Sequence, residues 1–136
     1  MDEKLELVKK MKDALAKNQA NQLKRISNEA IEKAVLTEDK ELVDISLVSY
    51  ALYKLLTKSH YQDSPEWVRL KEEVLECLEE CPPGELGRVL EEKIIQKIVK
   101  LDEAHGHYTH DLIDKARVKQ ASRVYAMGVS LETAIG

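Results

Sequence analysis

Apolar residues recur along this chain at intervals of three and four positions, the spacing that gives an α-helix one apolar face. Polar residues, Gly and Pro interrupt the pattern and divide it into six amphipathic segments. No stretch alternates apolar and polar residues as a β-strand does. We therefore predict an all-α protein, an antiparallel bundle of five to six helices, because short connections between long helices make neighbours antiparallel.

The first two predicted helices each carry a single apolar stripe. In the first helix the stripe consists of Leu5, Val8, Met11 (or Lys12) and Leu15. After a polar interruption at 18–21, the second stripe consists of Leu23, Ile26, Ala30 and Ala34, with Ile31 and Val35 beside it. This interruption is also compatible with one long, bent helix. Thr37 and Asp39 then supply capping groups for the start of a third helix.

The third predicted helix is the most apolar of the six. One of its stripes consists of Leu42, Ile45, Ser49, Leu52 and Leu56. A second stripe lies next to the first and consists of Val43, Leu47 and Tyr50. A helix that is apolar over so much of its circumference has other helices around it. We therefore place this helix at the centre of the bundle.

Proline and serine residues mark the limits of the fourth predicted helix. Ser64 is a preferred N-cap residue, and Pro65 is tolerated at the first helical position. The residues that face inward are Trp67, Leu70, Val74, Cys77, Leu78 and Cys81. Pro82 and Pro83 end this helix because neither can donate a backbone hydrogen bond. A fifth helix follows, with its apolar stripe at Leu86, Leu90, Ile94, Ile98 and Leu101.

The last part of the chain predicts a helix, a turn and the start of another helix. Thr109 can cap the sixth helix, whose apolar residues are Leu112, Ile113, Ala116, Val124 and Met127. Gly128 breaks this helix, and Ser130 can cap the next one, where Ala134 begins a new apolar face. The pattern leaves open whether the sixth helix crosses the bundle or extends away from it.

The segment from Lys115 to Gly136 resembles the first one and a half helices of bacterial and archaeal helix-turn-helix regulators and related antitoxins. The matching residues are Ala121, Tyr125, Gly128, Val129, Ser130 and Ala134. The resemblance implies a left-handed turn at Gly128 and close packing of the small Ala134 on the preceding helix. In that family a second turn and a recognition helix follow. They do not follow here, and we expect the chain to be a fragment of a longer protein.

We divide the chain into a helical bundle over 1–106 and a basic, helix-turn-helix-like segment over 107–136 that packs on the bundle. The body in front of this segment resembles prokaryotic helical-bundle proteins, archaeal ones among them. Composition agrees with helices, since Leu, Glu, Lys and Ala dominate and the chain contains five Gly and three Pro. No Phe is present.

Charge is distributed unevenly along the chain, and this limits the interactions with nucleic acid. The net charge of −4 excludes a general nucleic-acid coat, which needs a basic surface. Residues 37–81 hold five basic and eleven acidic side chains, and residues 115–136 hold four basic and one acidic. Ordinary surface patterning is one explanation of this contrast. The other is contact with phosphate groups through the four basic residues, Lys115, Arg117, Lys119 and Arg123.

A histidine cluster in the segment 102–111 is a candidate metal site. His105, His107 and His110 lie within six residues, next to several carboxylates. Imidazole and carboxylate groups at this density could hold zinc or nickel. The alternative is a solvated connection between two helices, because Gly106 and Thr109 are typical of such a loop.

The residue types that catalysis requires are not found in a recognised arrangement. The chain has no Gly-x-Ser-x-Gly elbow and no phosphate-binding Gly-rich loop. Cys77 and Cys81 lie four apart on one predicted helix and lack a second ligand pair, so we expect buried small side chains rather than a zinc site. We predict no cofactor. Two free cysteines and no apolar run of membrane-spanning length agree with a reducing cytoplasm.

These observations together favour a non-enzymatic, partner-binding or oligomerising helical module of a nucleic-acid-associated regulator, itself lacking a recognition helix. We expect a protein partner or a homodimer, weak and salt-sensitive nucleic-acid binding at most, and no membrane partner. One alternative is a protein–protein adaptor with no nucleic-acid role. Another is a metal-binding helical protein that uses the histidine cluster.

Overall fold

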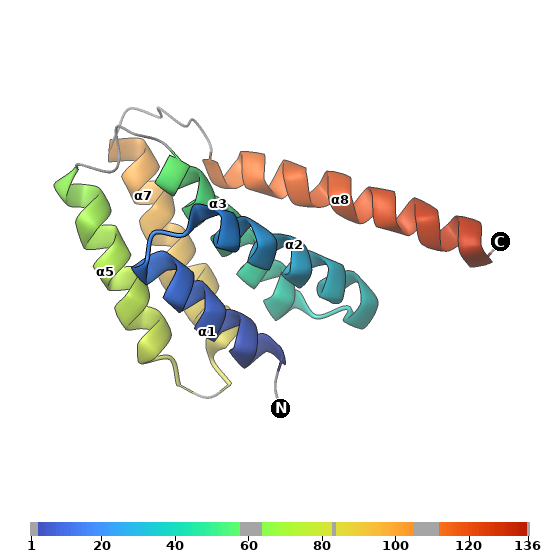
Figure 1. The fold of residues 1–136 in the computed structure, drawn as a ribbon, viewed down its shortest axis with the longest axis horizontal. Helices are drawn as coiled ribbons and strands as arrows, with labels where there is room; N and C mark the ends of the chain where they lie inside the picture. Colours follow the sequence, from blue (N-terminus) through green and yellow to red (C-terminus); the bar gives the residue numbers. More distant parts are fainter. Residues whose placement is uncertain (1–2, 58–63, 83, 105–111, 136) are drawn as a thin grey trace.

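The computed structural model describes residues 3–57, 64–82, 84–104 and 112–135, and the side chains of all of these except 102–104, 112 and 128–135. Within these ranges every regular element is a helix and none is a strand, so the predicted all-α bundle is confirmed. The helices α6, η1 and α7 follow one another directly and make one rod (Figure 1). The elements are α1 (Glu3–Ala16), α2 (Ala20–Thr37), α3 (Lys40–Thr57), α5 (Pro65–Glu79), α6 (Leu86–Arg88), η1 (Val89–Ile95), α7 (Gln96–Ala104) and α8 (Leu112–Ile135).

Helix α3 lies at the centre of the bundle, as predicted. It contacts α1, α2, α6, η1 and α8. Both of its predicted apolar stripes face these neighbours, and only Val43 and Tyr50 among their members are partly exposed. The residues of α3 that are buried are Leu42, Asp44, Ile45, Ser46, Leu47, Val48, Ser49, Ala51, Leu52, Leu55 and Leu56.

Two serines join α3 to α2 by hydrogen bonds. These two helices make the most extensive contact among the described elements. The Ser27 hydroxyl donates to the backbone carbonyl of Ser46 at 2.8 Å, and the Ser46 hydroxyl donates to that of Ser27 at 2.8 Å. Both side chains are buried. Because each hydroxyl finds a carbonyl on the other helix, two polar residues pack in the interior without an unpaired donor.

Helices α1 and α2 are two separate helices, so the alternative of one long, bent helix is wrong. Asn18 has a φ of 56°, and the amide of Gln19 donates to the carbonyl of Ala14 at 2.8 Å to close the turn. The predicted stripe of α2 is buried. In α1 the prediction was wrong at Leu5, which is 63% exposed, whereas Leu7 is buried.

The first turn of α1 faces charged groups rather than apolar ones, and this explains the error at Leu5. The Lys4 ammonium lies 2.6 Å from a Glu41 carboxylate oxygen and 3.1 Å from one of Asp39. Glu41 also accepts a hydrogen bond from the amide of Gly87 at 3.1 Å. The inward position of this turn is therefore occupied by Lys4, and Leu5 points outward.

The predicted helix starts are confirmed at two residues and wrong at a third. The Ser64 hydroxyl accepts a hydrogen bond from the amide of Trp67 at 3.1 Å and caps α5. Asp39 accepts one from the amide of Glu41 at 2.9 Å at the start of α3. Thr37 does not cap α3, because its hydroxyl donates back to the carbonyl of Lys33 at 2.8 Å.

The fifth predicted helix contains a π-helical segment, η1, which the apolar pattern did not reveal. Hydrogen bonds from residue i to residue i+5 bring side chains five positions apart close to the same face. In η1 the buried residues form two such pairs, Val89 with Ile94 and Leu90 with Ile95. The wider turn therefore directs all four apolar side chains to one face, whereas regular α-helical spacing would spread them over a wider arc.

Helix α8 is continuous from Leu112 to Ile135, so the predicted break at Gly128 and the helix start at Ser130 are wrong. A single Gly costs a helix only about 1 kcal/mol relative to Ala, and Ala126, Met127 and Leu131 near it are good helix formers. Thr109 and the predicted boundary at residue 106 lie outside the described residues. The likeness to helix-turn-helix regulators rests on the sequence alone.

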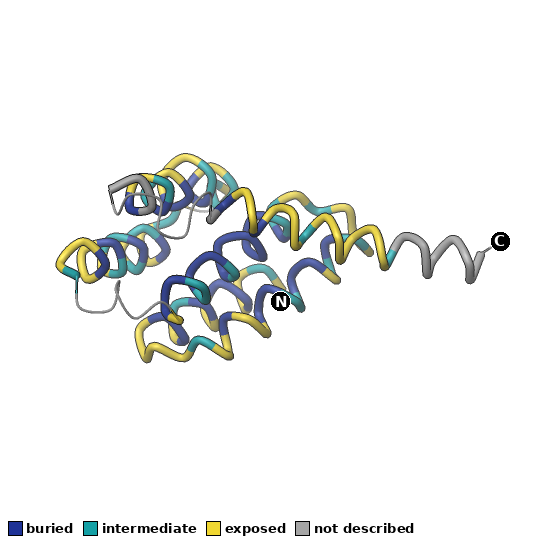
Figure 2. Tube along the Cα trace, turned by 90° about the horizontal axis from the view of Figure 1, so that it is seen from above, coloured by how far each residue is buried: buried dark blue, intermediate teal, exposed yellow. Residues whose placement is uncertain are grey.

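The contacts of α8 with the bundle that the structure describes lie in its first half, and the helix then extends past the ends of α2 and α3 (Figure 1). Ile113 and Ala116 are buried, and the Gln120 side chain donates to the carbonyl of Val43 at 2.9 Å. From residue 121 to residue 126 every side chain is exposed, which appears as the yellow stretch of α8 in Figure 2. Within the described part of the chain, no helix combines the length and hydropathy needed to cross a bilayer.

The central position of α3 predicts a large effect of Leu52→Ala. Leu52 is fully buried, and its truncation leaves a cavity among the surrounding helices, so we expect the free energy of unfolding to fall by about 2–5 kcal/mol. Leu36→Ala is the matched control, because Leu36 is 70% exposed. Urea unfolding followed by circular dichroism measures both, and equal effects would contradict the arrangement.

The continuity of α8 predicts that Gly128→Ala stabilises the protein by up to about 1 kcal/mol, since Ala is the better helix former. A left-handed turn at this position would give the opposite sign, because only Gly adopts that conformation without strain. Backbone chemical shifts of residues 121–135, with thermal unfolding, distinguish the two. Ala126→Gly is the control and should lower the helicity of the residues just before Gly128, because Gly is a poorer helix former than Ala.

Candidate functional site on helix α8

All four predicted nucleic-acid contacts lie on α8 and are exposed. Lys115, Lys119 and Arg123 follow one another at steps of four residues along one side of the helix, and Arg117 lies away from this line. The structure therefore brings three of the four residues together.

Two of these four cations already have carboxylate partners. Arg123 forms an ion pair with Glu32 of α2, across the contact between the two helices. The guanidinium of Arg117 lies 3.9 Å from the carboxylate of Asp114, one turn earlier in α8. Among the described residues no carboxylate pairs with Lys115 or Lys119. The basic surface open to a phosphate backbone is therefore smaller than the sequence indicates.

Helix α8 also exposes apolar side chains, which the sequence interpretation did not single out. Val118 is 66% exposed and Tyr125 is 74% exposed. With Ala121 they occupy positions three, four and seven residues apart and form one stripe, which we name the outer face of α8. Val124, predicted to face inward, is also exposed.

The spacing of the outer face could have been recognised from the sequence, but a helix with apolar residues on two sides offers two candidate inward faces. Ile113 and Ala116 occupy the inward one in the structure. Tyr125 was interpreted only as one of the residues that resemble a helix-turn-helix. In the structure it lies on the continuous helix α8, and its side chain is exposed to solvent.

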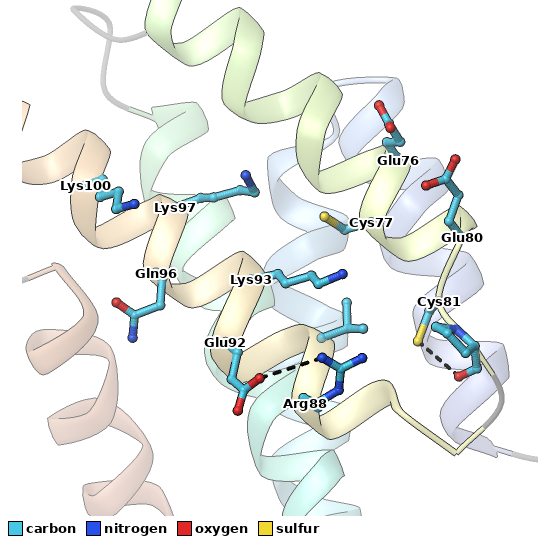
Figure 3. A pocket seen from close by; sticks show the side chains of 12 residues that line it. Glu76, Cys77, Glu80, Cys81, Arg88, Glu92, Lys93, Gln96, Lys97 and Lys100 are labelled. Carbon is cyan, nitrogen blue, oxygen red and sulfur yellow. Dashed lines mark hydrogen bonds and ion pairs between the residues drawn. The ribbon is translucent and has the colours of Figure 1, made fainter.

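A second surface feature is a groove of about 530 Å³ between α5 and the rod formed by η1 and α7 (Figure 3). Basic side chains line the wall formed by the rod, among them Lys93, Lys97 and Lys100. Glu76 of α5 and Glu80, directly after α5, line the opposite wall. One described ion pair joins the rod to α5, in which the Lys97 ammonium lies 3.1 Å from a carboxylate oxygen of Glu73.

The two cysteines line this groove as free, half-buried thiols, rather than the fully buried side chains that we predicted. The Cys81 thiol donates to the carbonyl of Pro82 at 3.6 Å. Burial raises the pKa of Cys81, and the charge of Glu85 adds to this shift. A thiol held in its protonated form is a poor nucleophile and a poor metal ligand.

The predicted metal ligands His105, His107 and His110 lie outside the described residues, so the metal site stays a prediction. In the part of the chain that the structure describes, no three His, Cys, Asp or Glu residues gather into a group that could hold a metal ion.

Comparisons with models of known families, with curated proteins and with solved structures gave no match to this chain.

Proposed function

We propose that this protein is a non-enzymatic, oligomerising helical module that pairs with a second copy through the outer face of α8. The observation that carries the proposal is the stripe formed by Val118, Ala121 and Tyr125. The stripe is exposed, on a helix whose described contacts with the bundle lie in its first half.

Physical reasoning supports a helix as the occupant of this face. Apolar residues three, four and seven positions apart are the anchors by which one helix packs on another. Tyr and Val contribute large apolar contact areas, and Tyr keeps its hydroxyl at the wet edge of an interface. Burying each side chain contributes roughly 1.5–3 kcal/mol, which favours association when a partner covers the stripe.

The test is sedimentation velocity over a range of protein concentrations. We expect the protein to self-associate, and the double variant Val118→Glu, Tyr125→Glu to weaken this by about tenfold or more, because two charges replace the buried area. Leu36→Glu is the control, since it places one such charge at an equally exposed apolar residue of α2.

A protein that stays monomeric at concentrations up to about 1 mM would contradict the proposal. Equal weakening by Leu36→Glu and by the α8 variant would also contradict it, because the effect would then be one of net charge. Capture of a different protein through α8, without self-association, would favour the adaptor hypothesis.

A second candidate function is weak, sequence-independent DNA binding, favoured by the two lysines of α8 that lack a described ion pair. Two phosphate contacts predict that the logarithm of the affinity falls with the logarithm of salt concentration at a slope of about −2. Lys115→Ala with Lys119→Ala should remove this binding, whereas Arg123→Ala should leave it, because Arg123 is paired with Glu32. Fluorescence anisotropy with a DNA duplex of arbitrary sequence measures the affinity. Unaltered affinity in the lysine variant would contradict a role of Lys115 and Lys119 in DNA binding.

A further inference from the structure

Asp44 is the one ionisable side chain that is buried among the residues the structure describes. It lies on α3, is 6% exposed, and has the apolar residues of the core on either side of it in the helix. An ionised carboxylate is costly in such a place unless a positive group or several hydrogen-bond donors compensate for it. The neighbour of Asp44 is instead another carboxyl group.

The carboxyl groups of Asp44 and Glu91 are neighbours, because Lys40, one turn before Asp44 on α3, forms an ion pair with Glu91 of the π-helical segment η1. A side-chain hydrogen bond between the two carboxyl groups contributes to the raised pKa of Asp44. Two ionised carboxylates have only acceptor oxygens, so this bond requires one proton between them. Lys40 lies 3.1 Å from a carboxylate oxygen of Glu91 and stabilises the ionised form of that residue. The proton therefore resides on Asp44, which donates to Glu91.

The charged groups around the pair agree with this assignment. Burial raises the pKa of Asp44 to about 7, and the charge and hydrogen bond of Glu91 add to the shift. The hydrogen bond from Lys40 lowers the pKa of Glu91. The other charged groups that act on the pair are Glu41 on α3, itself bonded to Lys4 of α1, and Arg117 on α8.

We propose that the proton shared by Asp44 and Glu91 is a pH-sensitive latch that holds η1 against α3. When Asp44 loses this proton, the two facing carboxylates repel each other and the contact between the helices loses its hydrogen bond. The latch does not depend on self-association through α8, because both carboxyl groups belong to the body of one chain.

The expected dependence of stability on pH follows from the direction of the shift. The folded Asp44 keeps its proton to about pH 7, whereas the unfolded residue loses it near pH 4. Between these values the folded state binds more protons than the unfolded state, so stability falls as pH rises. The equilibrium constant for unfolding should increase by up to about tenfold per pH unit between pH 5 and pH 7, and level off above.

Asp44→Asn tests the latch, because an amide can still donate to Glu91 but cannot ionise. Asp13→Asn is the matched control, since Asp13 is an exposed carboxylate paired with Lys17 at 3.2 Å. We expect the pH dependence of unfolding between pH 5 and pH 7 to be smaller in Asp44→Asn than in the wild type and unchanged in Asp13→Asn. The same pH dependence in all three proteins would overturn the proposal.

Two measurements on the wild-type protein keep the test valid if Asp44→Asn fails to fold. Carbon-13 NMR of the Asp44 carboxyl group should report a titration near pH 7, and a midpoint below pH 5 would overturn the proposal. Amide exchange, corrected for its intrinsic pH dependence, should show η1 losing protection by about tenfold between pH 6 and pH 8. The loss should be larger in η1 than in α1, which shares only the fall in global stability, and a smaller loss in η1 than in α1 would also overturn the latch.

Discussion

The burial of α3 on nearly all sides is the constraint on which the rest of the structure depends. A helix with apolar residues around its circumference exposes too much apolar surface unless several helices cover it at once. Helices α1, α2, η1 and α8 each cover part of it. Small serines of α2 and α3 lie within the most extensive of these contacts, and their hydroxyls are paired there.

The same constraint explains why the polar groups inside the bundle are few and specifically placed. Ser46 is satisfied by α2, and the Ser49 hydroxyl lies 3.1 Å from the sulfur of Met11. Asp44 is the exception, because its carboxyl group lies beside that of Glu91 where α3 contacts η1. Because α3 is buried on nearly all sides, Asp44 must either carry a proton or weaken the contact between α3 and η1. This makes Asp44 a candidate for control of that contact by pH.

The sequence predicted the fold well where one face of a helix is clearly more apolar than the other. The stripes of α2 and α3 and the cap at Ser64 are confirmed by burial and hydrogen bonding. It failed where the choice depends on tertiary contacts. Leu5 and Leu7 fit a helical stripe about equally well, and only the pairing of Lys4 with Asp39 and Glu41, at the start of α3, decides between them.

For the candidate site, the sequence predicted the basic residues of α8 but not which of them remain open. The pairing of Arg123 with Glu32 joins residues far apart in the chain, and no local pattern contains that information. At Gly128 a local turn signal was outweighed by helix-forming neighbours. An exposed stripe, rather than a turn toward a recognition helix, is the consequence for function.

The central claim is that the outer face of α8 is an interface, and NMR of the backbone amides at increasing protein concentration tests it most directly. We expect concentration-dependent shifts confined to α8 and greatest near Val118 and Tyr125, with the amides of α1 and α5 unchanged. Shifts spread over the body of the bundle, or spectra independent of concentration, would contradict the claim.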